Sequence, residues 1–138
     1  MARADRAIYA LLKGDSRVTD IAGTRITPVG TERGGSLPAV VYQQISGARE
    51  HSCAGPLARV EVRMQVTCWA ATYNAAVLLA EAVRKAVDGF TGTIAGVTLQ
   101  QTKVEDEGDM PVIDAEAAAA SAYGRRLDVL MTAVESTT

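Results

Sequence analysis

The stretch "ARVEVRMQVTCWA", residues 58–70, constrains the fold more than any other part of this 138-residue chain. Apolar and polar side chains alternate along it, with Val60, Val62, Met64, Val66 and Cys68 in one set and Glu61, Arg63, Gln65, Thr67 and Trp69 in the other. Because successive strand side chains point to opposite faces of a sheet, the alternation predicts a strand with one buried face and one polar face. Cys68 belongs to the buried set, so we expect a small buried apolar side chain there.

Helical signals occur in three segments, where apolar residues recur at spacings of three and four. The predicted helices are residues 3–13, a short helix capped by Asp15 or Ser16 and ended by Gly23, and a long helix from Thr72 or Asn74 to about Asp88. Their core-facing residues are predicted to be Ala4, Ala7, Ile8, Leu11, Leu12, Val18, Ile21, Ala76, Leu79, Ala80, Val83, Val87 and Phe90.

Three further strands are predicted from β-branched and aromatic content, and they are separated by Gly-, Pro- and acid-rich segments. The predicted strands are residues 38–46, 97–106 and 122–134, and the connecting segments are 30–38, 47–56 and 107–120, with a short extended piece limited by Pro28. We therefore expect a single α+β domain over residues 1–138. It has a mainly antiparallel four-stranded sheet, with one long helix and a short N-terminal helical pair packed on it. The connection from Cys68 to Val97 is long enough for a crossover, which would make one strand pair parallel.

Candidate catalytic residues are confined to "GAREHSCAGP", residues 47–56, which contains the only histidine of the chain, His51, and one of its two cysteines, Cys53. Nucleophilic catalysis requires a nucleophile, a base and a group that orients the base. No such third group, nucleophile elbow, zinc-ligand spacing or phosphate-binding loop is recognisable in the sequence. We therefore predict a protein that is not an enzyme and uses no cofactor or metal, with a small Cys53–His51 hydrolase as the alternative.

Charge is divided unevenly along the chain. Residues 1–103 contain twelve Lys or Arg and eight Asp or Glu, whereas residues 104–138 contain two Arg and eight acids. Six of these acids fall between Glu105 and Glu116 with no base among them. Such a run is typical of a solvated acidic loop, and the alternatives are a surface for a basic partner, a cavity lining or a loose divalent-cation site. The composition offers no basic stripe for nucleic acid, and no apolar run is long enough for a membrane span.

The order of segments resembles the tail-completion proteins of long-tailed bacteriophages, a family similar in role to tail terminators. The resemblance covers roughly residues 7–131. The segments that carry it are "IYALLKGDSRVTDIAGTRITPV", "PAVVYQQISGAREHSCAGP", "ARVEVRMQVTCWAATYNAAVLLAEAVRKAVDGF" and "VEDEGDMPV". Together, their order and spacing are distinctive, although none of them is a chemical motif.

The resemblance implies a structural virion protein that forms a ring, with six copies as the expected number, on the head-proximal end of the tail tube. The implied partners are other copies of the chain, the tail tube protein and the head connector or head-closure protein, with DNA passing through the ring without specific binding. Assembly is expected in the host cytoplasm, because the N-terminal residues lack a secretory signal. An alternative role is a head-closure or neck connector protein, and another is a monomeric ligand-binding module.

In a ring, one patch of each subunit meets a different patch of the next, and the uneven charge suits such contacts. We predict a subunit interface in which Arg49 or His51 of one copy approaches the acidic stretch of its neighbour. The alternative location of that stretch is the ring lumen, where its charge would repel DNA. The residues predicted to form the interface are Arg49, Glu50, His51, Glu105, Asp106, Glu107 and Asp109.

Overall fold

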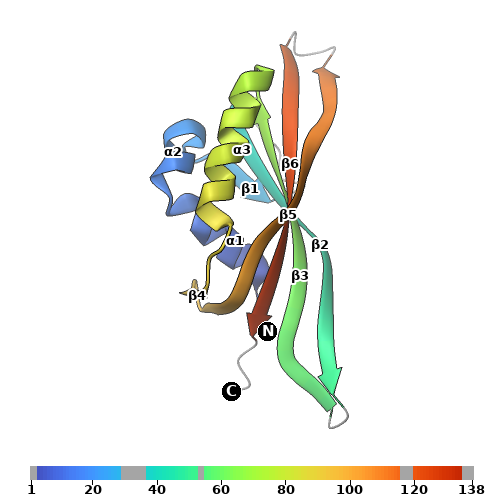
Figure 1. Cartoon of the computed structure of the whole chain (residues 1–138). Helices are drawn as coiled ribbons and strands as arrows, with labels where there is room; N and C mark the ends of the chain where they lie inside the picture. Colours follow the sequence, from blue (N-terminus) through green and yellow to red (C-terminus); the bar gives the residue numbers. More distant parts are fainter. Residues whose placement is uncertain (1–2, 29–36, 53–54, 116–119, 135–138) are drawn as a thin grey trace.

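The computed structural model describes residues 3–28, 37–52, 55–115 and 120–134, and within them three helices cover one face of a six-stranded sheet (Figure 1). The helices are α1 (Ala4–Lys13), α2 (Ser16–Ala22) and α3 (Tyr73–Val87). The strands are β1 (Ile26–Pro28), β2 (Ala39–Ser52), β3 (Gly55–Ala70), β4 (Gly92–Ile94), β5 (Val97–Ala115) and β6 (Ala120–Val134). The predicted α+β class and the helices packed on one face of the sheet are confirmed.

The strand order across the sheet is β1-β2-β3-β6-β5-β4. The four long strands, β2, β3, β6 and β5, pair antiparallel in that order, as the predicted four-stranded sheet requires. The predicted strand number is nevertheless wrong, because β1 and β4 add one short strand at each edge. The predicted short extended piece limited by Pro28 is β1, whereas β4, which also has three residues, is too short for a periodic pattern to identify.

The long connection from Cys68 to Val97 does not produce the parallel strand pair that the sequence suggested. That connection, which contains α3 and β4, crosses over β6, so that β3 and β5 flank β6 and do not pair with each other. The only parallel pair among the described strands is β1 with β2, in which Ile26 lies opposite Val40. The crossover places α3 against the centre of the sheet, over β3 and β6.

Two predicted loops are strand instead. In place of a turn over residues 47–56, β2 continues to Ser52 and β3 already begins at Gly55. In place of a connection over residues 107–120, β5 continues to Ala115 and β6 begins at Ala120. Backbone pairing with the neighbouring strand therefore outweighs the low strand propensity of these Gly-, Pro- and acid-rich sequences.

The core lies between the helices and the apolar face of β3, β6 and β5. Asp15 caps α2 by accepting a hydrogen bond from Arg17 N at 2.9 Å, and Thr72 caps α3 in the same way through Ala75 N at 3.2 Å. The predicted core positions are largely confirmed. The largest fully buried side chains are Ile8, Leu12, Val18, Val40, Met64, Val66, Leu79, Val83, Val87, Leu99, Leu127 and Met131.

Two hairpins project beyond the rest of the sheet, at opposite ends of the strands (Figure 1). Pairing of β3 with β6 spans the register from Arg59 opposite Val134 to Ala70 opposite Tyr123. Beyond the end where Arg59 lies opposite Val134, β2 and β3 pair only with each other. Beyond the other end, β5 and β6 pair only with each other. We call residues 50–52 with 55–58 the β2–β3 arm, and residues 111–115 with 120–122 the β5–β6 arm.

Candidate subunit interface

The predicted acidic residues of the interface lie on β5, where strand alternation separates them onto the two faces of the sheet. Glu107 pairs with Leu127 of the core, and Asp109 pairs with Arg125, so both belong to the face that carries the helices. Glu105 and Asp106, in contrast, lie with polar side chains of the face that no helix covers. The four acids from Glu105 to Asp109 therefore form two clusters, one on each face.

The cluster on the helical face is organised by Arg125 of β6. Its Nη1 lies 2.9 Å from Asp109 Oδ1, and its Nη2 lies 3.3 Å from Glu107 Oε2. At the first residue of α3, the Tyr73 hydroxyl donates a hydrogen bond to Asp109 Oδ2 at 3.3 Å. Partial burial opposes the charge of Arg125, but the two carboxylates outweigh it and raise the pKa of the guanidinium. This cluster joins β5, β6 and the start of α3.

The cluster on the open face contains two arginines. Arg126 Nη1 lies 3.2 Å from Asp106 Oδ2 and 3.0 Å from Asp128 Oδ2. Arg63 of β3 reaches across to Glu105, with Nη2 and Oε2 2.8 Å apart. Exposed pairs of this kind contribute about 0.2–1 kcal/mol each, so their main consequence is the charge pattern of the surface.

The bases that accompany the acidic run come from other strands, which is why the run looked unpaired in the sequence. Five carboxylates, including that of Asp128, face three guanidinium groups, and the two clusters keep a net negative charge. The sequence signal for this arrangement was the adjacent pair Arg125 and Arg126, whose alternation in β6 directs one base to each face. Cross-strand opposite-charge pairs follow once β5 and β6 are known to be neighbours.

The other predicted interface residues lie on β2, far from the acids in the strand order. Arg49 lies opposite Val60, and His51 lies opposite Pro56 of β3, so both belong to the strand that leads into the β2–β3 arm. β3 and β6 lie between β2 and β5. One copy of the chain therefore does not bring Arg49, Glu50 or His51 next to the acidic residues as strand neighbours.

Both outer long strands leave part of their edge without a paired strand in the described parts of the chain. β1 pairs with β2 only from Val40 to Tyr42, and β4 pairs with β5 only from Val97 to Leu99. The connection after α3 covers a little more of β5, since Gly89 N donates to Thr102 O at 2.8 Å and Asp88 Oδ1 accepts from Val104 N at 3.0 Å. We call residues 44–52 the β2 edge and residues 107–115 the β5 edge.

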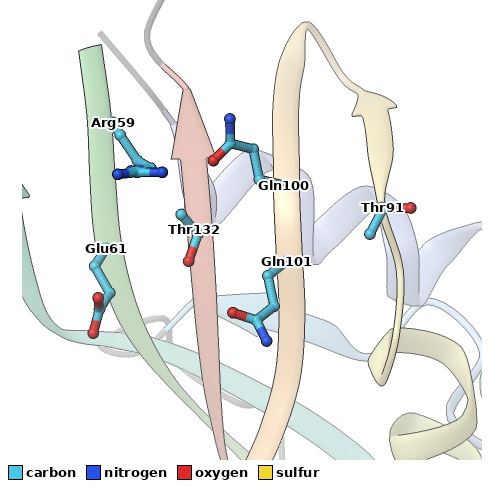
Figure 2. Close-up of a pocket in the computed structure, with 6 residues that line it drawn as sticks. All are labelled: Arg59, Glu61, Thr91, Gln100, Gln101 and Thr132. Carbon is cyan, nitrogen blue, oxygen red and sulfur yellow. The ribbon is translucent and has the colours of Figure 1, made fainter. Parts of the chain in front are cut away.

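A depression of about 650 Å³ lies on the polar side of the sheet near the ends of β3, β6 and β5 (Figure 2). Its lining is polar and contains neither the acidic clusters nor a nucleophile with an adjacent base. The lining residues are Arg59, Glu61, Thr91, Gln100, Gln101 and Thr132. The depression therefore offers hydrogen-bonding groups to a partner surface and no catalytic arrangement.

Catalytic and metal-binding interpretations gain no support from the described residues. Cys68 is fully buried on the helical face, as predicted, and burial raises the pKa of its thiol, with Glu107 adding to the effect. Cys53 lies outside the described residues. No group of three or more potential ligands for a metal forms within the described ranges, and none of the described helices could cross a membrane.

Comparison with known proteins identifies the family. The model of the family described as "Tail completion protein gp17" matches residues 6–122. A solved chain from the "Virion of native gene transfer agent (GTA) particle" has the same fold, with a TM-score of 0.66 at 17% identity over 92% of this chain and 90% of that chain. A search of curated protein sequences finds no match.

The family match covers most of the chain and most of its described structure. It confirms the resemblance drawn from the order of the segments. It also makes a Cys53–His51 hydrolase the wrong interpretation, because the matched family is structural. The chain belongs to the tail completion protein gp17 family, and it is a structural, non-enzymatic protein of a phage-like virion.

Proposed function

We propose that the protein forms a ring, with six copies as the expected number, that ends the tail tube at its head-proximal side and provides the face to which the head docks. We also propose that residues 1–138 act as one tail-completion domain. The observation that carries the ring is the pair of arms at opposite ends of the sheet (Figure 1). A ring subunit needs two different surfaces for its neighbours, and the arms and their free edges provide them.

The charge clusters support a role at the ring interface or lumen. Because Arg125 and Arg126 each serve two carboxylates, the β5 side keeps excess negative charge even after pairing within the chain. Facing a neighbour, this charge would attract Arg49 or His51. Facing the lumen, it would repel DNA during passage. We favour the neighbour, because the clusters lie beside an unpaired strand edge.

The contact between Arg49 or His51 and the acidic clusters is tested by charge reversal. We expect Arg49→Glu to weaken ring assembly, and raising the salt to about 1 M to weaken assembly of the unchanged chain by screening. Ring formation is measured by native mass spectrometry and size-exclusion chromatography with light scattering. Assembly that is insensitive to both changes would contradict this contact.

The proposed position in the particle is tested with virions that lack the protein. We expect over-long tails or tails without heads in electron micrographs, and restoration of normal tails when the purified protein is supplied during assembly in host cytoplasm extracts. Labelled protein should lie at the junction of tail tube and head connector. Tails of normal length that carry heads would overturn the proposal, and a label on the head side of the joint would indicate a head-closure protein instead.

A further inference from the structure

The direction of the backbone amides shows which groups the β2 edge offers. Val40 N donates to Arg25 O at 2.8 Å, so the amide of Val40 points away from β3 and toward β1. Backbone groups alternate between the two sides of a strand. The alternation continues to Gln44 opposite Met64, and the irregularity between Gln44 and Ser46 then shifts it by one residue. Between Gln44 and Arg49, the outward amides of the β2 edge are therefore those of Gln44, Gly47 and Arg49.

The same reasoning applies to the β5 edge. Val104 N donates to Asp88 Oδ1, so this amide points away from β6. Val104 pairs with Val129 and Asp106 with Asp128, so two steps along β5 correspond to one along β6, and the alternation shifts by one residue. The amides of Glu107 and Asp109 therefore point outward, and those of Asp106 and Gly108 point to β6.

Each edge thus offers outward backbone groups, with amides at Gln44, Gly47 and Arg49 on β2 and at Glu107 and Asp109 on β5, and such an edge is the usual template for adding another strand. The two edges differ in charge. The β5 edge contains Glu107, Asp109 and Asp114 with no base, whereas the β2 edge contains Arg49, Glu50 and His51. Two β5 edges would place like charges opposite each other, which is destabilising. A β5 edge and a β2 edge avoid that conflict.

We infer that the occupant of the β5 edge is the β2 edge of a second copy of this chain, joined to it by backbone hydrogen bonds. This inference rests on the proposed ring and specifies how its subunits join. Within one copy β2 and β5 run in opposite directions, so repeating the copy around an axis gives an antiparallel pair. The contact is head-to-tail, and each copy keeps one edge for each neighbour.

A geometric consequence follows from the positions of the edges. The β2 edge leads into one arm and the β5 edge into the other, at opposite ends of the sheet (Figure 1). For the two edges to pair, the β2 edge of one copy must lie beside the β5 edge of the next copy, although the two edges are at opposite ends of the sheet. The strands must therefore be inclined to the ring axis, as they are in a barrel with staggered strands.

The inference is tested by crosslinking two single-cysteine variants, Gly47→Cys and Asp109→Cys, in chains in which Cys53 is replaced by Ser. Cys68 can remain because it is fully buried. A short bismaleimide crosslinker is added to each variant alone, to their mixture, and to a control mixture of Gly47→Cys with Asp20→Cys on the exposed surface of α2. We expect a crosslinked pair of chains in the Gly47→Cys and Asp109→Cys mixture, at about tenfold the level of the other samples.

Hydrogen exchange supplies a readout that needs no substitution. On assembly, the outward amides of Gly47, Arg49, Glu107 and Asp109 should exchange at least about tenfold more slowly, whereas those of Asp106 and Gly108, already paired with β6, should change little. Crosslinking of Gly47→Cys to itself would overturn the inference in favour of a two-fold contact. Rings without the mixed crosslink or the added protection would overturn it as well.

The two proposals fail in different ways. Both experiments are carried out on the purified protein and on tails to which it has bound. If rings form and end the tube but the β2 and β5 edges stay unpaired, the edge contact is wrong and the proposed function stands. If the protein neither forms rings nor binds tails, the proposed function and the edge contact both fail.

Discussion

The centre of the sheet and its two arms differ in the contacts that stabilise them. In the centre, β3 and β6 each pair on both sides and bury one face under α3, and side chains such as Met64 and Leu127 are fully enclosed. In the arms, each strand pairs with one partner only. An isolated two-stranded hairpin is marginally stable in water. The comparison indicates that the centre specifies the fold, whereas the arms become fully supported only against another surface.

The sharpest test of this comparison is a pair of truncations, one in the centre and one on the exposed β2 edge that leads into the β2–β3 arm. Leu79→Ala removes a fully buried side chain of α3, and we expect a loss of about 2–5 kcal/mol in the free energy of unfolding. Ile45→Ala removes a side chain of the β2 edge that is 46% exposed, and we expect less than about 0.5 kcal/mol. Urea unfolding of both variants provides the measurement. A large loss for Ile45→Ala would show that the β2 edge is held as tightly as the centre.

Two glycines test how far tight packing extends toward the β5–β6 arm. A Cβ added at Gly124 would lie 2.6 Å from Trp69 Cζ3, so Gly124→Ala must displace a buried indole, and we expect a loss of about 1–3 kcal/mol. A Cβ at Gly108 would meet the end of the Arg126 side chain at 3.0 Å, which can move, so Gly108→Ala should cost less than about 0.5 kcal/mol. Thermal unfolding should separate the two variants. Equal losses would show that the sheet is equally rigid at both positions.

The cap of α2 provides a pH-dependent test of the centre. The hydrogen bond from Arg17 lowers the pKa of Asp15 below its usual value of 3.8. A carboxyl group with a lowered pKa in the folded state contributes stability above its unfolded pKa, and loses it as the pH falls through the folded value. At pH 7, Asp15→Ala should cost about 1 kcal/mol, a difference that shrinks as the pH falls below the usual value. Asp15→Asn keeps a capping oxygen but no charge, so its loss at pH 7 should be smaller, and it too should shrink as Asp15 of the unchanged protein becomes protonated.

A small loss of stability is expected for a change in the acidic cluster on the helical face. Asp109→Asn removes the ionic contact with Arg125, and we expect a loss of about 0.2–1 kcal/mol that disappears in about 1 M salt. Its effect on assembly should exceed its effect on unfolding, since the residue lies on the β5 edge. A matched measurement on Glu81→Gln, which removes an exposed ion pair of α3, controls for a general loss of surface charge.

Most of the centre could be predicted from sequence because its side chains repeat with a clear period. The alternation in residues 58–70 and the helical spacing of α1 and α3 both reflect burial of one face, which is the strongest local signal. The arms could not be predicted in the same way. Residues 107–115 contain three acids, Gly108 and Pro111, and only their pairing with β6 makes them a strand.

The candidate interface shows the same limit. The acidic residues were recognisable from the sequence, but their division between two faces depends on the register with β6, and their partner Arg63 comes from another strand. The free edges depend on how far β1 and β4 extend, which no periodic pattern reports. Properties that depend on which strands are neighbours thus remained hidden, because neighbours are set by the crossover of α3 over β6.

That crossover also determines the order in which the strand pairs form during folding. The β2–β3 and β5–β6 pairs are hairpins between consecutive strands, whereas the β3–β6 pair joins segments such as Val66 and Leu127 that are remote along the chain. Contacts between remote segments form slowly, because the intervening chain must first be ordered. The pairing of β3 with β6, which joins the two hairpins, should therefore form last. Until it forms, β2 and β5 are not held at their final separation, so a half-folded copy cannot bind a neighbour on both sides.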